Sequence, residues 1–273
     1  MKKHLSTILL ILVFLIGLSL LLYPTISDYV NSKHQSRAIT KYAEAVSAMD
    51  QQIYQEMWQE AADYNAAMAE QGTVWQMSAE AQAEYDRTLD VDGNGMMGYI
   101  EITKLHCSLP IYHGTEEGTL LRAIGHLPGS SLPVGGQGSH CVLSGHRGLP
   151  SAKLFSELDR LALGDRFVLR TLDQELTYEV DQILIVLPDE VDALTIQPGL
   201  DLCTLVTCTP YGVNSHRLLV RGHRVENTAD AAEARVTADA IQIEPAIVAP
   251  LMAAPVLVVL AVAVLTGSRK KRK

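Results

Sequence analysis

The sequence predicts a mainly β domain, a sandwich or a barrel, that follows N-terminal helices and lies between two membrane segments. Three observations predict it. Residues 98–226 hold short β-branched runs separated by Gly, Pro and Asp, residues 39–68 show a helical apolar period, and an uncharged run lies near each end. The chain has 273 residues, 48% of them hydrophobic, which suits one sizeable core and excludes a disordered or collagen-like protein.

Charge is unevenly distributed along the chain. The net charge is -9, although Lys2, Lys3 and all five residues from 269 to 273 are basic, so the body between them is acidic. An acidic body lacks the positive surface that binds a phosphate backbone, which argues against a nucleic-acid-binding protein. Four cysteines are too few for a disulfide scaffold in a chain of this length.

The first uncharged run covers residues 5–23, about the length at which a helix crosses the hydrocarbon core. Lys2 and Lys3 precede it. A secretory signal peptide would have a shorter apolar core and small residues at its cleavage site, whereas Tyr23 and Pro24 follow here. We therefore expect a retained anchor over residues 1–24.

A second uncharged run, residues 246–267, is followed at once by a basic tail over residues 268–273. Pro250 and Pro255 interrupt the run, but membrane helices tolerate proline. Because Lys and Arg flank both runs on their outer ends, the positive-inside rule predicts a two-pass protein of the cell membrane. Both termini are expected in the cytoplasm and residues 25–245 outside, with 229–245 as a linker.

The segment 25–90 is expected to be helical. Apolar residues recur at steps of three and four from Ile39 to Met68, which predicts one long helix that ends at Gly72. A shorter helix is expected over residues 78–89. The long helix is expected to pack on its own domain, since it lacks the sustained heptad charge pairs of a coiled coil.

The character of the sequence changes over residues 91–228, where a β domain is expected. Six runs have the composition of strands: MGYIEITKL, HCVLSGH, RFVLRTL, LTYEVDQILIVL, LCTLVTC and HRLLVRGHRV. Their spacing is typical of a sandwich or a barrel.

Residues 90–101 match the formula of a calcium-binding EF-hand loop, with Asp90, Asp92, Asn94, Gly95 and Glu101 at the ligand positions. An EF-hand needs a helix on each side, and the residues after Gly98 alternate like a strand. We therefore expect a turn between helix and strand.

Three residues at predicted strand ends have the chemistry of a nucleophilic site. Cys208 ends TLVTC, and Arg217 opens the next strand after a connection whose turn residues suggest a hairpin-like return. Such a return would bring the thiol and the guanidinium together. A nearby cation favours the thiolate, the form that attacks carbonyl carbon. His146 ends another strand and opens a Gly-containing loop, where a general acid or base is commonly displayed.

Each candidate also has an ordinary interpretation: a buried small hydrophobe for Cys208, a solvated edge charge for Arg217 and one loop histidine among nine for His146. Cys107, Cys141 and Cys203 fit a core, and Cys203 should face the opposite side of the strand from Cys208. A zinc site from Cys203, Cys208, His216 and His223 has the wrong spacing.

The block TLVTCTPYGVNSHRLLVRGHR, together with GYIEI, LPIYHGT, GHLPGSSLPVGG and LSGHRGLPSAKLFSELDRLALGD, resembles the sortases, specifically the class C, pilus-polymerising sortases of Gram-positive bacteria. The resemblance covers residues 85–226. It implies an eight-stranded closed β-barrel and catalytic roles for Cys208, His146 and Arg217.

The implied activity is that of a cysteine transpeptidase that cleaves a Leu-Pro-X-Thr-Gly-type sorting signal and transfers it to a pilin lysine. The resemblance implies secreted pilin precursors as partners and no metal or other cofactor. A sortase-like hydrolase and a cell-wall-anchoring sortase are alternatives, as is a membrane-tethered binding module without catalysis.

Many class C sortases carry a lid with an Asp-Pro-aromatic motif ahead of the barrel. Residues 70–90 contain no Asp-Pro, and Trp75 is the one aromatic residue suited to plug the site. Trp75 is equally consistent with an ordinary core residue.

Overall fold

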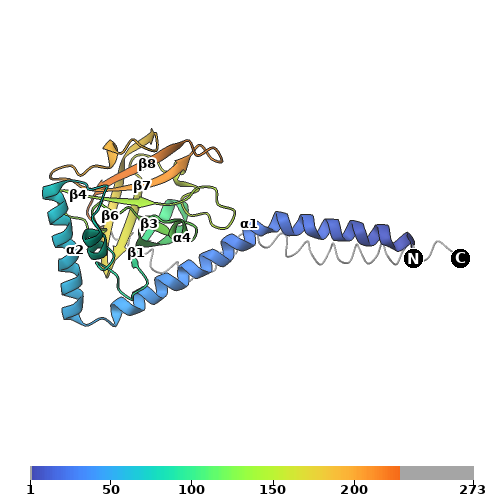
Figure 1. The fold of residues 1–273 in the computed structure, drawn as a ribbon, viewed down its shortest axis with the longest axis horizontal. Coiled ribbons are helices and arrows are strands. Elements are labelled where there is room, and N and C mark those ends of the chain that lie inside the picture. The colour runs from blue at the N-terminus through green and yellow to red at the C-terminus, as the bar shows by residue number, and fades with distance from the viewer. Residues whose placement is uncertain (1, 228–273) are drawn as a thin grey trace.

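The chain folds into a closed eight-stranded barrel to which two long helices are attached (Figure 1). The computed structural model describes residues 2–227, with side chains from Leu10 onward. The helices are α1 (Lys2–Ser47), α2 (Gln51–Gln71), α3 (Ala79–Tyr85) and α4 (Glu117–Leu120), with 3₁₀ turns η1 (Thr103–Leu105), η2 (Leu158–Arg160) and η3 (Asp192–Leu194). The second uncharged run, the linker and the basic tail lie outside the described residues.

The barrel strands are β1 (Met96–Ile102), β2 (Cys107–His113), β3 (Ile124–His126), β4 (Ser139–Ser144), β5 (Arg166–Thr171), β6 (Gln174–Val186), β7 (Asp201–Thr209) and β8 (His216–Arg224). Around the barrel they follow the order β1, β2, β3, β4, β7, β8, β6, β5. The β2-β3 and β4-β7 pairs are parallel, and the other pairs are antiparallel. The predicted barrel is confirmed, and all six expected runs form strands.

Two strands have no counterpart among those six runs. β3 has only three residues, too few to show a period, and Pro110 interrupts the strand pattern of β2. Both are held in the barrel by their neighbours: Ile111 to His113 pair with Ile124 to His126.

The expectation of one long helix from Ile39 to Gly72 is wrong at one point. α1 ends at Ser47 and α2 begins at Gln51, because the Asp50 side chain accepts a hydrogen bond from Gln52 N at 2.8 Å and caps a new helix. The stripe of apolar residues continues across the break because both helices pack on the barrel. Gly72 ends α2 as predicted, and its N–H donates to Met68 O.

The first helix continues beyond the expected anchor, residues 1–24. α1 runs through Pro24 without ending. Within the described part of the chain, one helix, over Leu10–Ser47, is long and apolar enough to span a membrane. None of the residues in its most apolar stretch is buried against the rest of the protein. This is consistent with membrane anchoring.

The barrel interior and the helix contacts share one hydrophobic core. Tyr42 and Val46 of α1 and Ala61 of α2 join the strand residues in that core. The buried Tyr42 hydroxyl donates to Met97 O and accepts from Leu172 N, both at 2.8 Å, so it packs without an unsatisfied polar atom.

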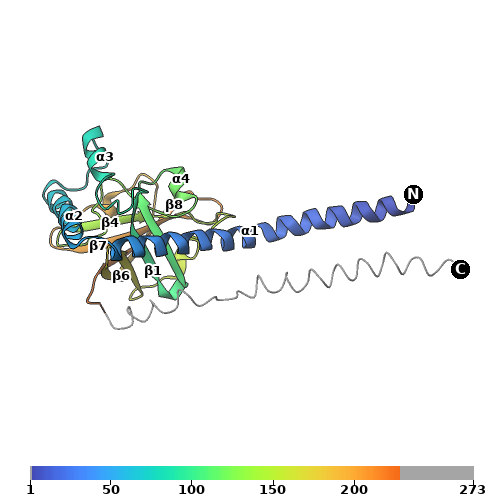
Figure 2. The ribbon, with the colours of Figure 1, turned by 90° about the horizontal axis from the view of Figure 1, so that it is seen from below.

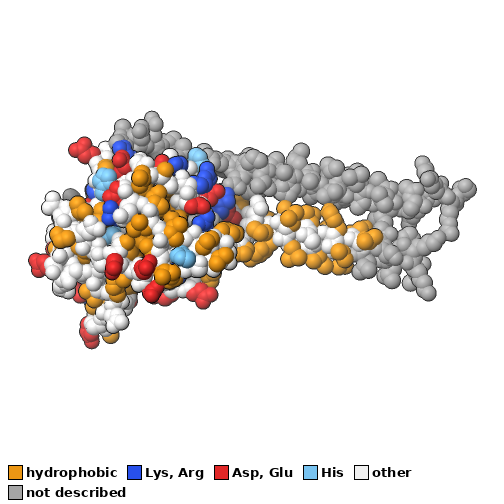
Figure 3. Space-filling model, turned by 90° about the horizontal axis from the view of Figure 1, so that it is seen from above, with side chains coloured by type: hydrophobic (Ala, Val, Ile, Leu, Met, Phe, Trp, Pro, Cys, Tyr) orange, Lys and Arg blue, Asp and Glu red, His pale blue; other side chains and the backbone are white. Residues whose placement is uncertain are grey.

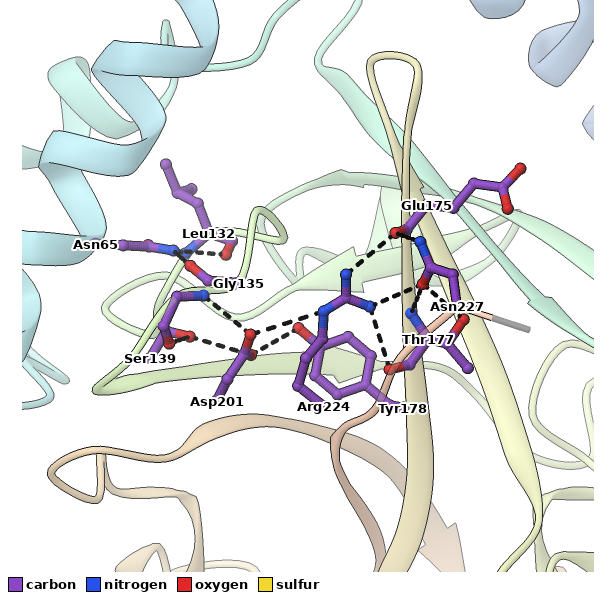
Figure 4. Close-up of polar contacts among 11 residues, drawn as sticks. Asn65, Leu132, Gly135, Ser139, Glu175, Thr177, Tyr178, Asp201, Arg224 and Asn227 are labelled. Carbon is purple, nitrogen blue, oxygen red and sulfur yellow. Dashed lines mark hydrogen bonds and ion pairs between the residues drawn. The ribbon is translucent and has the colours of Figure 1, made fainter. Parts of the chain in front are cut away.

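A polar network closes the end of the barrel at which β7 begins (Figure 4). Asp201 accepts hydrogen bonds from Tyr178 Oη at 2.9 Å and from Gly136 N at 3.0 Å, and burial raises the pKa of its carboxyl group. Nearby, Asn227 donates to Glu175 O at 2.8 Å. These contacts join β6, β7 and the residues after β8, so this end of the barrel is fixed.

Candidate active site

Cys208 and Arg217 lie side by side at the opposite end of the barrel from Asp201. They are register partners in the antiparallel β7-β8 pair, and side chains of directly opposed residues project on the same face. Both side chains are half-buried. The hairpin-like connection predicted between the two strands is thus confirmed, and it brings the thiol and the guanidinium together.

His146 follows β4, which runs parallel to β7. Ser144 is opposite Val206, Gly145 N donates to Val206 O at 3.0 Å, and Thr207 Oγ1 donates to Gly145 O at 2.8 Å. The chain therefore still runs beside β7 at Gly145, one residue before His146. All three candidates therefore come from adjacent strand ends.

The loop after His146 is fixed to its surroundings. Phe155 N donates to His146 O at 3.2 Å, and Gly148 N donates to Ser156 Oγ at 3.0 Å. The Arg147 guanidinium forms an ion pair with Asp159. These contacts fix the backbone that carries His146 relative to the strands.

The Arg217 guanidinium is held by the connection between β7 and β8. Its Nη1 donates to Asn214 O at 3.3 Å and to His216 O at 3.1 Å. A guanidinium has five N–H donors in a planar fork, so these bonds orient the group while leaving donors for a further acceptor.

An outer apolar cluster lies on the same barrel face as Cys208. Val206 precedes Cys208 by two residues in β7, and Leu219 follows Arg217 by two residues in β8, so these pairs share a face. The cluster has the buried residues Val142, Leu194, Val206 and Leu219, and Trp75, Leu127, Leu184, Val186 and Ala193 pack against them. Trp75 therefore covers the outside of the barrel rather than joining its interior core.

Backbone contacts hold the segment that carries Trp75. Ile196 N donates to Thr73 Oγ1 at 3.0 Å, and Val74 N donates to Gly129 O at 3.2 Å. Gly129 has a φ of 83°, and a Cβ there would lie 1.9 Å from Val74 O. Only glycine allows this close approach of the two backbones.

The barrel interior contains a second cysteine–histidine cluster that the sequence patterns did not reveal. Cys141 and Cys203 are register partners on β4 and β7, with 1% and 0% of their surface exposed. Burial acts to raise the pKa of both thiols, while hydrogen bonds to Cys203 and His126 lower that of Cys141. No substrate carbonyl reaches a thiol inside a packed core, so Cys208 remains the candidate nucleophile.

The calcium-like segment forms the predicted turn between helix and strand, and β1 begins at Met96. Asp90 Oδ1 accepts from Gly95 N at 2.8 Å, and Asn94 donates to Asp92 within the turn. Glu101 is bound elsewhere, to the buried Arg170 guanidinium at 2.6 Å. Among residues 2–227, no three His, Cys, Asp or Glu side chains form a group that could hold a metal ion.

The comparisons with known proteins agree with this geometry. The profile of the sortase domain matches residues 100–225. Sortase C1 of Streptococcus agalactiae is 50% identical, with a TM-score of 0.69 over 70% of this chain and 100% of that chain. Sortase C of Streptococcus pneumoniae is 44% identical, with a TM-score of 0.64 over 71% of this chain and 98% of that one.

Sortase D of Bacillus subtilis is 33% identical over 131 residues, which are 47% of this chain and 63% of that protein. Sortase A of Bacillus anthracis is 26% identical over 82% of this chain and 96% of its own length. The sortase-domain match thus covers the barrel from Ile100 in β1 to the end of β8, and the two sortase C structures match over 70% and 71% of this chain. The chain belongs to the sortase family of cysteine transpeptidases, and its barrel is similar to those of class C sortases.

Proposed function

We propose that this protein is a pilus-polymerising class C sortase in which Cys208 is the nucleophile, His146 the general acid and base, and Arg217 the oxyanion-stabilising group. One observation carries the proposal: Cys208 and Arg217 are opposed on β7 and β8, and β4, the strand that leads to His146, pairs with β7, in a chain 50% identical to a sortase C1. The substrates are secreted pilin precursors with a Leu-Pro-X-Thr-Gly-type sorting signal. In support, the crystal structure of the similar sortase C of Streptococcus pneumoniae gives insights into pilin substrate specificity.

In the first half of the reaction the Cys208 thiolate attacks the Thr-Gly carbonyl carbon. The Sγ–C bond forms and the C–N bond breaks, while His146 protonates the departing glycine amine. Negative charge develops on the carbonyl oxygen, and N–H groups of Arg217 donate to that oxygen. The product is a thioester acyl-enzyme.

In the second half a pilin lysine amine attacks the thioester. The C–S bond breaks, Cys208 leaves as thiolate, and His146 accepts the proton lost by the attacking amine. The new bond is an isopeptide bond between two pilin subunits. A thioester is more reactive toward amines than an amide, so the step needs no metal or nucleotide.

Trp75 acts as a lid in this proposal. It packs on the outer apolar cluster, which continues along β7 and β8 toward Cys208 and Arg217, and an extended sorting signal would need that surface. The absence of Asp-Pro leaves the carboxylate half of the usual lid motif without a counterpart here. Hydrogen bonds from Val74 and Ile196 hold the segment instead.

The first helix anchors the protein in the cell membrane, with the barrel outside and the N-terminus in the cytoplasm. The apolar window of the helix and Lys2 and Lys3 before it support this orientation. Residues 246–267 form the second span and the tail after them lies in the cytoplasm.

The test is to incubate the purified full chain with a Leu-Pro-X-Thr-Gly peptide and an amine acceptor, and to weigh the products. A transpeptidase gives the peptide joined to the amine through its Thr carbonyl, whereas a hydrolase gives the free Thr acid. A binding module leaves the peptide intact. Replacing the acceptor by a pilin lysine peptide or a cell-wall stem peptide distinguishes the pilus-polymerising enzyme from the cell-wall-anchoring one.

A further inference from the structure

α1 passes from the apolar segment into the barrel contacts without a break. It is a single helix of 46 residues, so no loop separates the membrane-spanning part from the docked part. In Figures 1 and 2 its N-terminal half projects from one end of the body, and α2 covers the other end. Because α1 is continuous, the direction of its apolar part determines the orientation of the barrel that is packed on its C-terminal part.

The docked part begins close to the apolar segment. Asp28 is five residues after Tyr23, about 7.5 Å along a helix axis, and its Oδ1 accepts from Lys153 N at 2.7 Å. Two turns further on, the buried Gln35 donates to Arg122 O at 2.8 Å. The body is thus attached at a short, fixed distance from the membrane boundary.

These contacts lie on the catalytic side of the barrel. Lys153 and Ser151 belong to the loop that follows His146, and Ser151 lines a shallow pocket against α1. That pocket is lined by Ser27, Val30, Asn31, His34, Leu121 and Ser151. Helix α4 and the loop that follows β4 both lie at the end of the body from which the apolar half of α1 leaves (Figure 1).

The same end has the surface of a membrane-contacting face. Leu121 is 43% exposed and Tyr29 45% exposed, and the Lys33 ammonium lies 5.8 Å from the centre of the Tyr29 ring. Figure 3 shows Lys and Arg side chains gathered where α1 leaves the body. Aromatic and basic side chains beside an apolar helix are typical of the headgroup layer, which extends roughly 5–8 Å beyond the hydrocarbon core.

We infer that the barrel rests on the phospholipid headgroups through a membrane-proximal face, residues 27–34 with Leu121, Arg122 and Ser151, so that its catalytic end faces the bilayer. The inference rests on the proposed membrane anchoring by α1. Sorting signals of membrane-held precursors would then reach Cys208 from the membrane side, where their effective concentration is high.

The test uses the full chain in nanodiscs of phosphatidylcholine and phosphatidylglycerol, with nitroxide-labelled headgroups as quenchers. Cys107→Ala and Cys208→Ala remove the two partly exposed thiols. A fluorophore is then placed by Leu121→Cys or by Leu200→Cys. Leu200 is the matched control, because it is 44% exposed and directly precedes β7 at the far end of the barrel.

We expect headgroup nitroxides to quench the Leu121→Cys label at least threefold more strongly than the Leu200→Cys label. Equal quenching, or none at either position, would overturn the inference. Because this variant lacks Cys208, the readout needs no catalysis, and its failure is distinguishable from failure of the proposed transpeptidase. Protein that does not enter nanodiscs would contradict the anchoring itself.

A second arm tests the docking. Asp28→Ala with Gln35→Ala should reduce quenching at position 121, since the hydrogen bonds that hold the membrane-proximal part of α1 to the body are lost. Ser36→Ala is the matched control, because its hydroxyl donates to Ser32 O within the same helix. Unchanged quenching in the double variant, with an unchanged melting temperature, would show that these contacts do not orient the barrel.

Discussion

Cys208 differs from the other cysteines in its position on the strand rather than in its sequence neighbourhood. Cys203 and Cys208 lie on one strand, five residues apart, so they face opposite sides of the barrel wall. Cys203 points into the core beside Cys141, whereas Cys208 lies on the outer face beside Arg217. The alternation of side chains along β7 thus makes Cys203 a core residue and leaves Cys208 as the candidate nucleophile.

Replacing Cys208 by Ala should abolish thioester formation and lower turnover by roughly 10⁶-fold, as loss of the nucleophile does in other triads. Cys203→Ala is the control on the same strand. It should retain activity and lower the free energy of unfolding by about 1 kcal/mol, because a small buried side chain is lost. Peptide cleavage and thermal unfolding measure the two effects. Near-normal turnover by the Cys208 variant would contradict a cysteine mechanism.

Arg217→Lys keeps the charge but replaces a planar fork of donors by a point charge on a flexible stem. Activity should fall by about 10²–10³-fold, the usual effect of losing an oxyanion donor. The melting temperature should change little, because the Arg217 side chain is only half-buried. Equal activity in the two proteins would mean that Arg217 supplies only positive potential.

At the scale of elements, the segment between α2 and α3 connects the helical region to the site. Gly72 ends α2, and Ser78 caps α3 by accepting from Ala81 N. The intervening residues cross the outer apolar cluster, where Trp75 packs. The two helices therefore determine where the Trp75 segment begins and ends.

If Trp75 is a lid, Trp75→Ala should raise the population of open sites and accelerate labelling of Cys208 by a bulky thiol reagent by tenfold or more. Trp58→Ala, on α2, is a control that removes the other tryptophan. Cys141 and Cys203 should stay unlabelled in both variants because they are buried. Equal labelling rates with and without Trp75 would indicate an open cleft.

The turn before β1 gives a separate prediction. Glu101 is held by the buried Arg170, so Glu101→Gln should lower the free energy of unfolding by about 1.5–3 kcal/mol, the contribution of a charge-assisted hydrogen bond. The loss should be the same with calcium and with a chelator, as measured by thermal unfolding. A calcium-dependent rise in the melting temperature of the unmodified protein would instead favour a calcium loop.

At the scale of the whole molecule, the two ends of the barrel are built differently. The Asp201 end is closed by a network of buried polar contacts, whereas at the Cys208 end the connection between β7 and β8, residues 210–215, is exposed. α1 attaches at the catalytic side through Lys153 and Arg122. The apolar helix is therefore attached to the barrel on the same side as the candidate active site.

The proposed two-pass topology predicts which parts of the chain are accessible from outside. In intact protoplasts, added protease should digest the barrel but spare an epitope tag placed after Lys273, because translocating five cations is costly. Lysed protoplasts serve as the control, in which the tag should be lost. Loss of the tag without lysis would mean that residues 246–267 do not cross the membrane.

Local sequence was sufficient to predict the elements with a strong period or a clear cap: the apolar helix, six of the eight strands, Gly72 at the end of α2 and the turn before β1. It also indicated Cys208, His146 and Arg217 as strand-end residues, because a strand end is a local property. The short β3 depends on pairing with distant residues, to which a local pattern is blind, and the apolar stripe that continues past Asp50 concealed the local cap there.

Only the tertiary structure decided which residues meet. The β7-β8 pairing sets Arg217 opposite Cys208, and the β4-β7 pairing brings the strand that leads to His146 beside β7. The same β4-β7 pairing brings Cys141 to Cys203 inside the barrel. The tertiary structure also decided that Trp75 packs on the outer face of the barrel and that α1 contacts the loop that follows His146. The order of the strands and the packing of α1 on the barrel depend on residues far apart in the sequence, because folding buries apolar surface contributed by the whole chain. Composition and periodicity describe only one segment at a time.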